Sequence, residues 1–391
     1  MYILHICNDF CYTKVHSQLY KRLDGLGVEQ TVFSPIHRCK TDVIGHNEYE
    51  SYHTQFVYAP VVKNYHRYVY HIKRSKVFHT MEKLIDGKHF DMVHATTLLT
   101  DGGLANLMWK KYSIPYVVSV RNTDINGFFD RMPHTWGDAR RILIHAKKVF
   151  FISEGLKEKL ENHRAVSNIV PQIKHKFVLL PNGIDDYYLD HVSRVPRSGH
   201  GIVYVGDFSS NKNVCRLVQA VLQLRRESYF SDLRLTIVGD GHGGNESVKR
   251  LIVDNPEVID FLGEIRDEER LCEVLRQQSV FAMPSIHETF GLVYIEALSQ
   301  NLAVVYTKGQ GIDGLFDETV GIAVNPLSVD EISSAIRSIF NRRERYGNNH
   351  VDFTQFRWNL IAKKYFEHYR SILGYDNIKD ELLCSFKKYG E

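Results

Sequence analysis

Short apolar segments alternate with longer amphipathic segments along the whole chain, and this alternation restricts the fold more than any other feature. Several apolar segments, including Tyr116–Val120 and Arg234–Val238, are dominated by consecutive apolar residues and show no polar alternation. Strands of this kind are buried on both faces. Helical patterns such as Val214–Arg226 and Glu268–Gln278 lie between them. The sequence therefore predicts an α/β fold in which helices cover both faces of parallel sheets.

The strand candidates form two series, separated by a segment with the composition of a linker. This segment, Ser193–Gly201, is rich in proline, glycine, serine and basic residues, and it follows a turn-type cluster at Pro181–Asp185. A chain of 391 residues is also too long for one small core. We therefore predict two Rossmann-like domains, residues 1–192 and 199–350. The other strand candidates are Tyr2–Cys7, Gln30–Phe33, Met92–His94, Val149–Ile152, Phe177–Leu180, Gly201–Val205, Val258–Phe261, Val280–Met283, Ala303–Tyr306 and Gly321–Val324.

The composition is that of a soluble globular protein. Apolar residues make up 43 % of the chain, charged residues 24 %, and the net charge is +3. This balance gives no reason to expect nucleic acid as a partner. No apolar segment approaches the roughly 20 residues that span a bilayer, and the first ten residues favour a buried strand over a secretory signal. The six cysteines form no C-x-x-C pair, so we expect free thiols in a cytoplasmic protein without a metal site.

One segment in the second series combines a strand, a loop and the start of a helix. Val280–Met283 is the strand, Pro284–Glu288 the loop, and a helical pattern begins near Gly291. The backbone N–H groups of Gly291, Leu292 and Val293 are then free to bind a phosphate. A glycine at this point also allows a ligand to approach the backbone closely.

Two glutamates, Glu288 and Glu296, flank this helix start. A carboxylate in the loop suits the hydroxyl groups of a sugar, and one farther along the helix suits the two hydroxyls of a ribose. For an arbitrary pair of glutamates, solvation at the surface would be the ordinary explanation. The strand–loop–helix context favours binding instead.

The segment with Glu288 and Glu296 resembles the E-x7-E signature of retaining glycosyltransferases of the GT-B fold, in particular family GT4. Further similarities occur in the family order at Phe151–Leu160, Leu180–Asp185, Leu235–Gly241, Phe261–Ile265 and Phe356–Leu373. The resemblance implies two Rossmann-like domains that face each other across a cleft. It also implies that the C-terminal segment, residues 355–391, returns as a helix to the N-terminal domain.

For the donor, the resemblance implies a diphosphate site around Gly206 and Lys212. The family often has an arginine just after this glycine, whereas this chain has Asp207. The resemblance implies that the main chain around Glu264 and Ile265 contacts the base and that Gly239 also contacts the donor. It further implies contacts with the diphosphate, the sugar and the ribose from Glu288, Phe290, Gly291, Leu292, Val293 and Glu296. Lys212 and Glu288 are the expected catalytic residues of this half, because a lysine neutralises the leaving phosphate.

The N-terminal half departs further from the family pattern. Asn8–Gln18, the loop after the first strand, lacks the family glycines, and Arg121 stands where a histidine is usual. An arginine cannot act as a base near neutral pH, but it can hold a phosphate or a carboxylate. Asp124 either orients Arg121, receives the acceptor proton or caps a turn. His94 either faces the acceptor or is a satisfied histidine at a strand end.

Residues 61–85 mix basic and aromatic side chains. A helix of this composition can lie on an anionic membrane; the alternative is a solvated helix with an aromatic inner face. Peripheral contact with the inner face of the membrane is thus one option for this segment.

These features together predict a retaining glycosyltransferase that moves a hexose-type sugar from a nucleoside diphosphate sugar, with a UDP-sugar as first choice. The acceptor would be a glycan or a lipid-linked molecule of a surface polysaccharide or glycolipid pathway. The chain has no Asp-x-Asp, so we expect neither a metal nor another cofactor. Two alternatives stay open: a nucleotide-sugar epimerase of the same fold, and a sugar-nucleotide-binding subunit without turnover.

Overall fold

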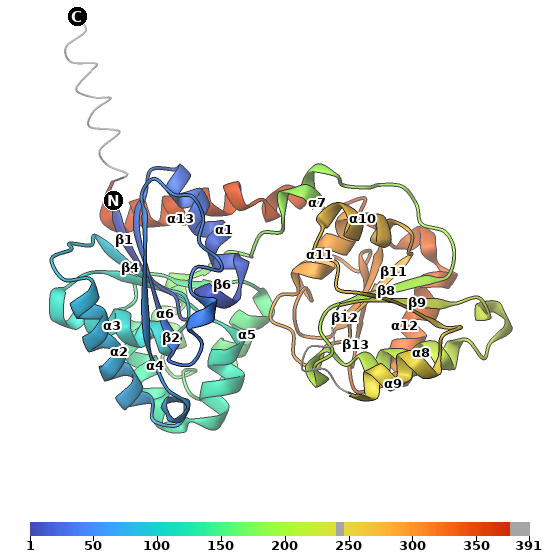
Figure 1. Ribbon diagram of the computed structural model, residues 1–391, viewed down its shortest axis with the longest axis horizontal. Helices are drawn as coiled ribbons and strands as arrows, with labels where there is room; N and C mark the ends of the chain where they lie inside the picture. The colour runs from blue at the N-terminus through green and yellow to red at the C-terminus, as the bar shows by residue number, and fades with distance from the viewer. Residues whose placement is uncertain (240–245, 376–391) are drawn as a thin grey trace, which may run out of the picture. The chain divides into compact units, whose positions relative to one another are not determined.

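Parallel strands form two separate sheets in the computed structural model, which describes residues 1–239 and 246–375 (Figure 1). Each sheet belongs to its own compact unit. Among the described residues, unit 1 comprises 1–152, 156–182 and 358–375, and unit 2 comprises 153–155, 183–239 and 246–357. The predicted α/β fold with two Rossmann-like domains is confirmed. Apart from residues 153–155, the chain passes between the units after residues 182 and 357, whereas the sequence placed these points near 192 and 355.

Unit 1 contains a seven-stranded sheet in the order β3-β2-β1-β4-β5-β6-β7, and all its strand pairs are parallel. The strands are β1 (Tyr2–Ile6), β2 (Glu29–His37), β3 (Thr54–Val62), β4 (Met92–Ala95), β5 (Tyr116–Ser119), β6 (Val149–Phe151) and β7 (Phe177–Leu179). The sequence did not predict β3. It is an edge strand, its residues are mostly half-buried, and it contains Pro60, which only an edge strand tolerates well.

The helices of unit 1 connect these strands and cover both faces of the sheet (Figure 1). They are α1 (Lys14–Gly25), α2 (Tyr70–Leu84), α3 (Thr100–Tyr112), α4 (Trp136–His145), α5 (Glu154–Asn162), which begins in unit 2, α6 (Val170–Ile173) and the last helix, α13 (Trp358–Leu373). Helix α13 packs on α1, and its buried residues Trp358, Ile361 and Tyr369 join the core around β1. This C-terminal helix packs in unit 1; of the segment 355–391 that was predicted to return to the N-terminal domain, residues 376–391 lie outside the described residues.

Unit 2 contains a six-stranded parallel sheet in the order β10-β9-β8-β11-β12-β13. The strands are β8 (Gly201–Val205), β9 (Arg234–Val238), β10 (Ile259–Gly263), β11 (Val280–Ala282), β12 (Ala303–Thr307) and β13 (Gly321–Val324). The helices are α7 (Asp186–Asp190), α8 (Val214–Leu224), α9 (Glu246–Asp254), α10 (Glu268–Arg276), α11 (Leu292–Ser299) and α12 (Val329–Asn341). Because every strand runs in the same direction, the loops after the strands gather at one edge, where Rossmann-like sheets bind ligands.

The basic, aromatic segment 61–85 is only partly helical, so the prediction of one helix is wrong for its first part. Strand β3 continues to Val62, a short 3-10 turn covers Asn64–Arg67, and α2 begins at Tyr70. Ile72, on the exposed face of α2, is 57 % exposed.

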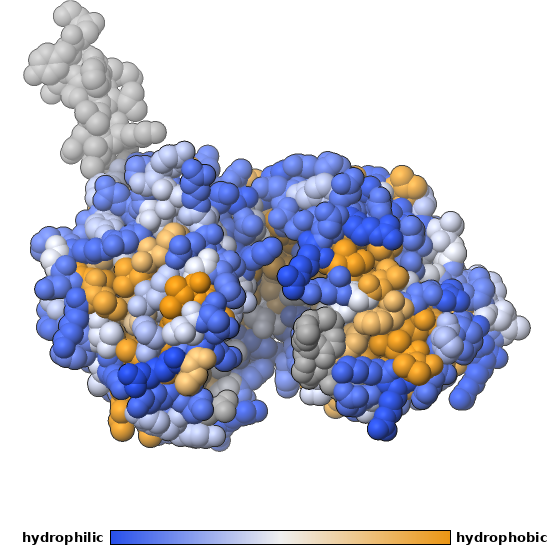
Figure 2. All heavy atoms as spheres, viewed as in Figure 1, coloured by the Kyte–Doolittle hydropathy of each residue, from blue (hydrophilic) through white to orange (hydrophobic). Residues whose placement is uncertain are grey.

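No helix in the described part of the chain is long and apolar enough to cross a membrane. The viewed surface of each unit carries hydrophilic and hydrophobic patches side by side (Figure 2).

Candidate functional site

Lys212 and Glu288 form an ion pair at the carboxyl edge of the sheet in unit 2. The Lys212 Nζ lies 3.0 Å from Glu288 Oε2, and both side chains are largely shielded, with 23 % and 10 % exposed. Lys212 ends the 3-10 turn Ser210–Lys212 after β8, and Glu288 lies in the loop after β11. The adjacent strands β8 and β11 thus bring together two residues that the sequence predicted to share one site.

The backbone around Glu288 is held by a residue that sequence reasoning missed. The side-chain oxygen of Gln310 accepts a hydrogen bond from the Glu288 N–H at 2.9 Å, and its Nε2 donates to the Ile286 carbonyl at 3.0 Å. The second carboxylate oxygen of Glu288 accepts the Thr289 N–H at 2.9 Å. Gln310 stands between two glycines directly after β12, and this Gly-Gln-Gly sequence is the signal that could have identified it.

The turn that carries Lys212 is tied to the same loop by Asn211. Its carbonyl accepts the Ile286 N–H at 2.7 Å, its Nδ2 donates to the His287 carbonyl at 2.9 Å, and its Oδ1 accepts the His287 N–H at 3.0 Å. Buried Asn213 donates to the Pro284 carbonyl at 2.9 Å. These bonds fix the distance between the two loops, so the lysine and the glutamate are held in place by the backbone as well as by their own charges.

Gly291 precedes α11 with a left-handed backbone, φ +76°. A Cβ at this position would overlap with the Tyr294 ring, and one at Gly311, φ +61°, would lie 3.0 Å from the Glu288 Cγ. Leu292 and Val293, the first two residues of α11, are half-buried. Backbone N–H groups in the first turn of a helix have no acceptor within the helix, so those of Leu292 and Val293 can donate to a ligand. The Phe290 side chain is buried, so only its backbone is available to a ligand.

Glu296 lies in the second turn of α11, eight residues after Glu288, and is half-buried. Burial, together with the negative charges of Asp185 and Glu268, raises the pKa of Glu296 to about 7. Burial destabilises the carboxylate form of Glu296, and a ligand that donates hydrogen bonds to this carboxylate would stabilise it.

Gly206 and Gly239 follow the neighbouring strands β8 and β9 and touch through their backbones. A Cβ on Gly239, φ +144°, would overlap with the Gly206 carbonyl oxygen, and the Gly239 N–H donates to the Gly263 carbonyl at 2.8 Å. Ile265 lies two residues beyond Gly263, half-buried. Backbone contacts therefore join the ends of β8, β9 and β10 at these three glycines.

In unit 1, Arg121 and Asp124 follow β5, as predicted. Asp124 is buried and accepts three backbone N–H groups: Leu98 at 2.9 Å, Leu99 at 3.1 Å and Arg121 at 2.9 Å. Burial, opposed by these bonds, raises the pKa of Asp124 to about 6. Of the roles considered for Asp124, the geometry fits the cap of a turn, because both of its oxygens are already occupied.

His94 is buried in the core of unit 1. Its Nε2 lies 3.2 Å from Ser119 Oγ and its Nδ1 lies 2.7 Å from the Tyr369 hydroxyl on α13. Burial and nearby cationic groups lower the pKa of His94 well below its ordinary value, so the ring is neutral. The geometry fits the satisfied histidine at a strand end, and it leaves no ring nitrogen for an acceptor.

A polar group after β1 was missed by sequence reasoning. Asp9 Oδ1 lies 3.1 Å from Nε2 of buried His16 on α1. Burial acts against ionisation, but His16 and Arg121 hold the pKa of Asp9 below its ordinary value. Arg121 itself donates from Nε to the Thr96 carbonyl at 3.1 Å. The loop that lacks the family glycines therefore carries a carboxylate beside Arg121.

Cys7, Asp9 and His16 place three possible ligand atoms within 4.8 Å of one another. Burial, together with Asp9 and Asp101, raises the pKa of the Cys7 thiol well above its ordinary value. The thiol therefore stays protonated and donates to Asp9 at 3.4 Å. The three side chains are joined by the Cys7–Asp9 hydrogen bond and by the Asp9–His16 contact.

Comparison with known proteins adds two family matches, one in each half of the chain. Residues 15–187 match the model for Glycosyltransferase Family 4, and residues 199–342 match the model for Glycosyl transferases group 1. An uncharacterized glycosyltransferase of Methanocaldococcus jannaschii is 22 % identical over 335 residues, which is 82 % of this chain and 86 % of that protein. The putative teichuronic acid biosynthesis glycosyltransferase TuaC of Bacillus subtilis is 23 % identical over 63 % of this chain and 60 % of its own length.

Solved structures share the fold over nearly the whole chain. Sucrose-phosphate synthase from Thermosynechococcus elongatus superposes with a TM-score of 0.73 at 17 % identity, covering 96 % of this chain and 99 % of that one. The Anabaena protein HepE, solved with UDP and glucose, superposes with a TM-score of 0.65 at 16 % identity, covering 95 % and 100 %.

Proposed function

Because the chain is a glycosyltransferase of the GT4 type with the GT-B fold, we propose that it transfers a hexose-type sugar from a UDP-sugar with retention of configuration. The observation that carries this proposal is the shielded ion pair between Lys212 and Glu288 beside the N-terminus of α11. A lysine close to the first N–H groups of a helix can bind the negatively charged oxygens of a diphosphate. The choice of UDP rests on HepE, whose structure was solved with UDP-glucose.

In the proposed reaction, Lys212 and the N–H groups of Leu292 and Val293 hold the diphosphate and stabilise its charge as it leaves. The Glu288 carboxylate holds hydroxyl groups of the sugar and fixes the position of Lys212. Glu296 accepts hydrogen bonds from the ribose hydroxyls. The backbone near Ile265 contacts the base. Catalysis then depends on positioning and on charge stabilisation of the leaving group rather than on a covalent intermediate. We propose no metal and no other cofactor for this reaction.

We further propose that the acceptor is bound by unit 1 and is a glycan or a lipid-linked molecule. Asp9 and Arg121 follow β1 and β5 at the carboxyl edge of that sheet, and the charge of Arg121 contributes to lowering the pKa of Asp9. In this proposal the Arg121 guanidinium orients an acidic group of donor or acceptor.

The experiment is a two-step assay with the full chain. A thermal-shift screen of UDP-glucose, UDP-galactose, GDP-mannose and ADP-glucose first identifies the donor, because a bound donor stabilises the native state. Proton NMR of the donor with and without pooled acceptors then reports the anomeric configuration of any product. We expect a UDP-sugar to stabilise the chain and the product to keep the donor's configuration. A shift with GDP-mannose or ADP-glucose alone contradicts the choice of UDP, and a product of inverted configuration contradicts retention.

A further inference from the structure

Three potential metal ligands meet where the chain leaves β1. They are the Cys7 thiol, the Asp9 carboxylate and the His16 imidazole, and their ligand atoms all lie within 4.8 Å of one another. Cys7 comes directly after the strand and is held there by a hydrogen bond from its N–H to the Phe33 carbonyl on β2, at 3.0 Å. His16 stands in the first turn of α1, which the Thr13 hydroxyl caps. The sheet and the helix thus fix two of the three ligands.

The distances between these atoms are close to those around a tetrahedral zinc ion. Zinc bonds of about 2.3 Å to sulfur and about 2.0–2.2 Å to nitrogen or oxygen place neighbouring ligand atoms about 3.3–3.6 Å apart. In the structure, Cys7 Sγ lies 3.4 Å from Asp9 Oδ1, which lies 3.1 Å from His16 Nε2. The third distance, between Cys7 and His16, is at most 4.8 Å. Small side-chain shifts therefore bring all three atoms to positions that coordinate zinc.

The cluster is enclosed but reaches solvent through one side chain. Cys7 is fully buried and the His16 side chain is only 4 % exposed, whereas the Asp9 side chain is 38 % exposed. A metal site needs ligands that are held in place and a path by which the ion enters. The two buried ligands supply the first, and the exposed carboxylate supplies the second.

Two acidic side chains and one basic side chain set the charge around the thiol. Asp9 and Asp101 both act on Cys7 and raise its pKa, and the charge of Arg121 acts in turn on Asp9. Asp101 is fully buried on α3, and its Oδ1 has no hydrogen-bond partner among residues 1–239 and 246–375. A buried polar atom without a partner is costly, and a cation beside the thiol would stabilise this carboxyl group in its ionised form.

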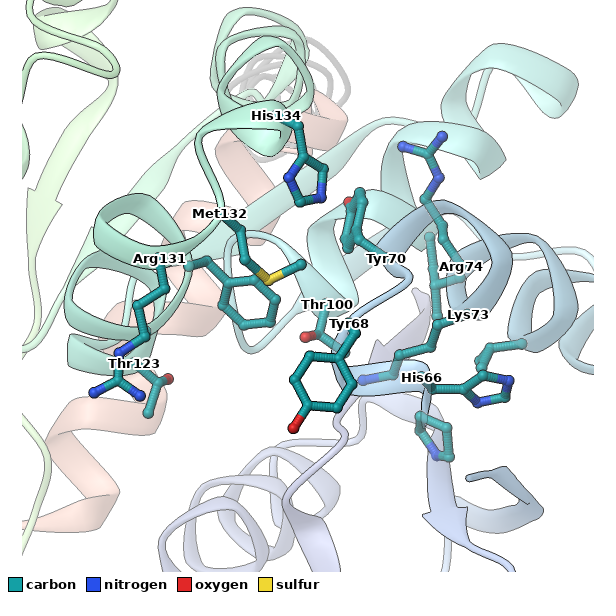
Figure 3. Close-up of a pocket in the computed structure, with 15 residues that line it drawn as sticks. His66, Tyr68, Tyr70, Lys73, Arg74, Thr100, Thr123, Arg131, Met132 and His134 are labelled. Atoms are coloured by element: carbon teal, nitrogen blue, oxygen red, sulfur yellow. The ribbon is translucent and has the colours of Figure 1, made fainter. Parts of the chain in front are cut away.

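The cavity found elsewhere in unit 1 has the opposite character. It has a volume of about 700 Å³, and its lining in the described part of the chain includes Lys73, Arg74 and Arg131 but neither a cysteine nor a carboxylate. Its two histidines, His66 and His134, project from different sides (Figure 3). Of these two parts of unit 1, the loop after β1 is therefore the one that suits a cation.

The types of ligand select among metal ions. Mg²⁺ and Ca²⁺ bind through oxygen, so a thiolate and an imidazole in the set argue against both. Zinc accepts sulfur, nitrogen and oxygen, either from four protein ligands or from three with one open position. The Cys7 cluster offers three ligands of these three kinds.

We propose that Cys7, Asp9 and His16 bind one zinc ion at the carboxyl edge of the sheet in unit 1. This site goes beyond the proposed function, because no step of the sugar transfer uses the ion. On binding, the S–H bond of Cys7 breaks, a Zn–S bond forms and the proton passes to solvent; Asp9 and His16 each give a lone pair, and no group is oxidised or reduced. The sequence gave no sign of such a site, because a single cysteine is completed here by side chains of two other types.

The test uses the full chain without a histidine tag, after a chelator has removed metal ions. Cobalt is the probe, because a cobalt–thiolate bond absorbs in the near ultraviolet and a tetrahedral cobalt ion absorbs visible light. We expect one equivalent of Co²⁺ to produce both absorptions and one equivalent of Zn²⁺ to remove them.

Three variants identify the ligands. Cys7→Ser should abolish the ultraviolet absorption. His16→Gln and Asp9→Asn should each weaken cobalt binding by at least about 10- to 100-fold, because even a change in a residue that only supports a metal ligand costs this much affinity.

Two further variants serve as matched controls. Cys11→Ser removes a buried thiol of the same loop that lies outside the cluster. His163→Gln removes a ring whose Nε2 lies 3.2 Å from Asp130, a histidine–aspartate contact like that of the cluster but outside it. Both controls should bind cobalt as the parent chain does.

The proposal is overturned if cobalt gives the parent chain no ultraviolet absorption, if this absorption survives in Cys7→Ser, or if either control loses it. Circular dichroism shows which variants fold. If Cys7→Ser and His16→Gln do not fold, Asp9→Asn decides, because its partly exposed side chain loses the charge and keeps its shape. Cobalt binding by Asp9→Asn that equals that of the parent chain then overturns the proposal.

Discussion

The Lys212 ammonium and the Glu288 carboxylate lie 3.0 Å apart, although 76 positions separate them in the chain. Both are held by loops that follow adjacent strands, and the glutamate is shielded to 10 % exposure. The pair is preorganised: each charge is held in place before a donor arrives, so little reorganisation is needed when the diphosphate and the sugar bind.

Glu288→Gln is expected to lower kcat of transfer about 100- to 1,000-fold. The amide keeps the shape of the side chain but cannot neutralise Lys212 or accept hydrogen bonds on two oxygens. The assay follows release of the nucleoside diphosphate at a saturating concentration of donor.

Glu273→Gln is the matched control, because Glu273 forms an exposed ion pair with Arg270 on the surface of α10, at 2.7 Å. Exposed pairs contribute little, so this variant should keep the parent rate. Equal rates for Glu288→Gln and the parent chain would remove Glu288 from the reaction.

Gly239→Ala should destabilise unit 2 by more than about 2 kcal/mol, because the new methyl group overlaps with the Gly206 carbonyl oxygen and neither backbone can yield. Gly263→Ala is the control: its φ is +70°, but a Cβ there would meet no atom within 4 Å. It should cost only the strain of a left-handed alanine, about 1–2 kcal/mol. Thermal unfolding followed by circular dichroism distinguishes the two variants. If Gly239→Ala destabilised the chain less than Gly263→Ala, the close contact between Gly239 and Gly206 would be disproved.

Donor affinity should rise with pH between about 6 and 8 through the ionisation of Glu296. The pKa of this group is about 7 in the folded chain, against an ordinary value of 4.5. A ribose that donates two hydrogen bonds favours the carboxylate form, so below pH 7 binding must also release a proton. Calorimetric titration of UDP across this range should show affinity increasing up to about tenfold per pH unit on the acid side.

Glu296→Gln should remove this pH dependence and lower the affinity at pH 8. Without donor, the stability of the folded chain depends on pH in the opposite direction to the donor affinity. Because the folded pKa lies above the unfolded value, the contribution of Glu296 to stability is fully present below about 4.5 and is lost as the pH rises to about 7. A pH-independent affinity in the parent chain would exclude Glu296 as a ribose ligand.

The parts of the fold that the sequence predicted are those with local signals. Buried strands such as Gly201–Val205 are continuous apolar segments, and their bounds were predicted correctly. Strand β3, Thr54–Val62, was missed although it is apolar from Phe56 onward, because it contains Pro60, and a proline within an apolar segment argues against a strand inside a sheet. Helix α2 was predicted to start too early, because Val61 and Val62 belong to the end of β3 and Asn64–Arg67 form a 3-10 turn.

The candidate site likewise contains residues that the sequence indicated and contacts that it did not. Glu288 and Glu296 stand on one strand–loop–helix segment, and this context in the sequence predicted a shared site for them. Gln310 binds the backbone of Glu288 from 22 positions away, and His16 reaches Asp9 from the next helix. Contacts of this kind exist only once parallel strands have brought separate loops to one edge, and no periodicity in the sequence encodes them.

Asp124→Asn tests whether this residue acts through structure or through chemistry. Its two oxygens accept N–H groups from Leu98, Leu99 and Arg121, and an amide retains only one acceptor. We therefore expect a loss of about 1–3 kcal/mol in stability. Binding of the acceptor should also weaken, because the Arg121 backbone loses its hydrogen bond to Asp124. Asp130→Asn, at the exposed end of the same segment, alters only a contact of 3.2 Å with His163 and should change stability by less than about 1 kcal/mol. Unchanged thermal unfolding of Asp124→Asn with abolished transfer would reverse the conclusion and place this carboxylate among the reacting groups.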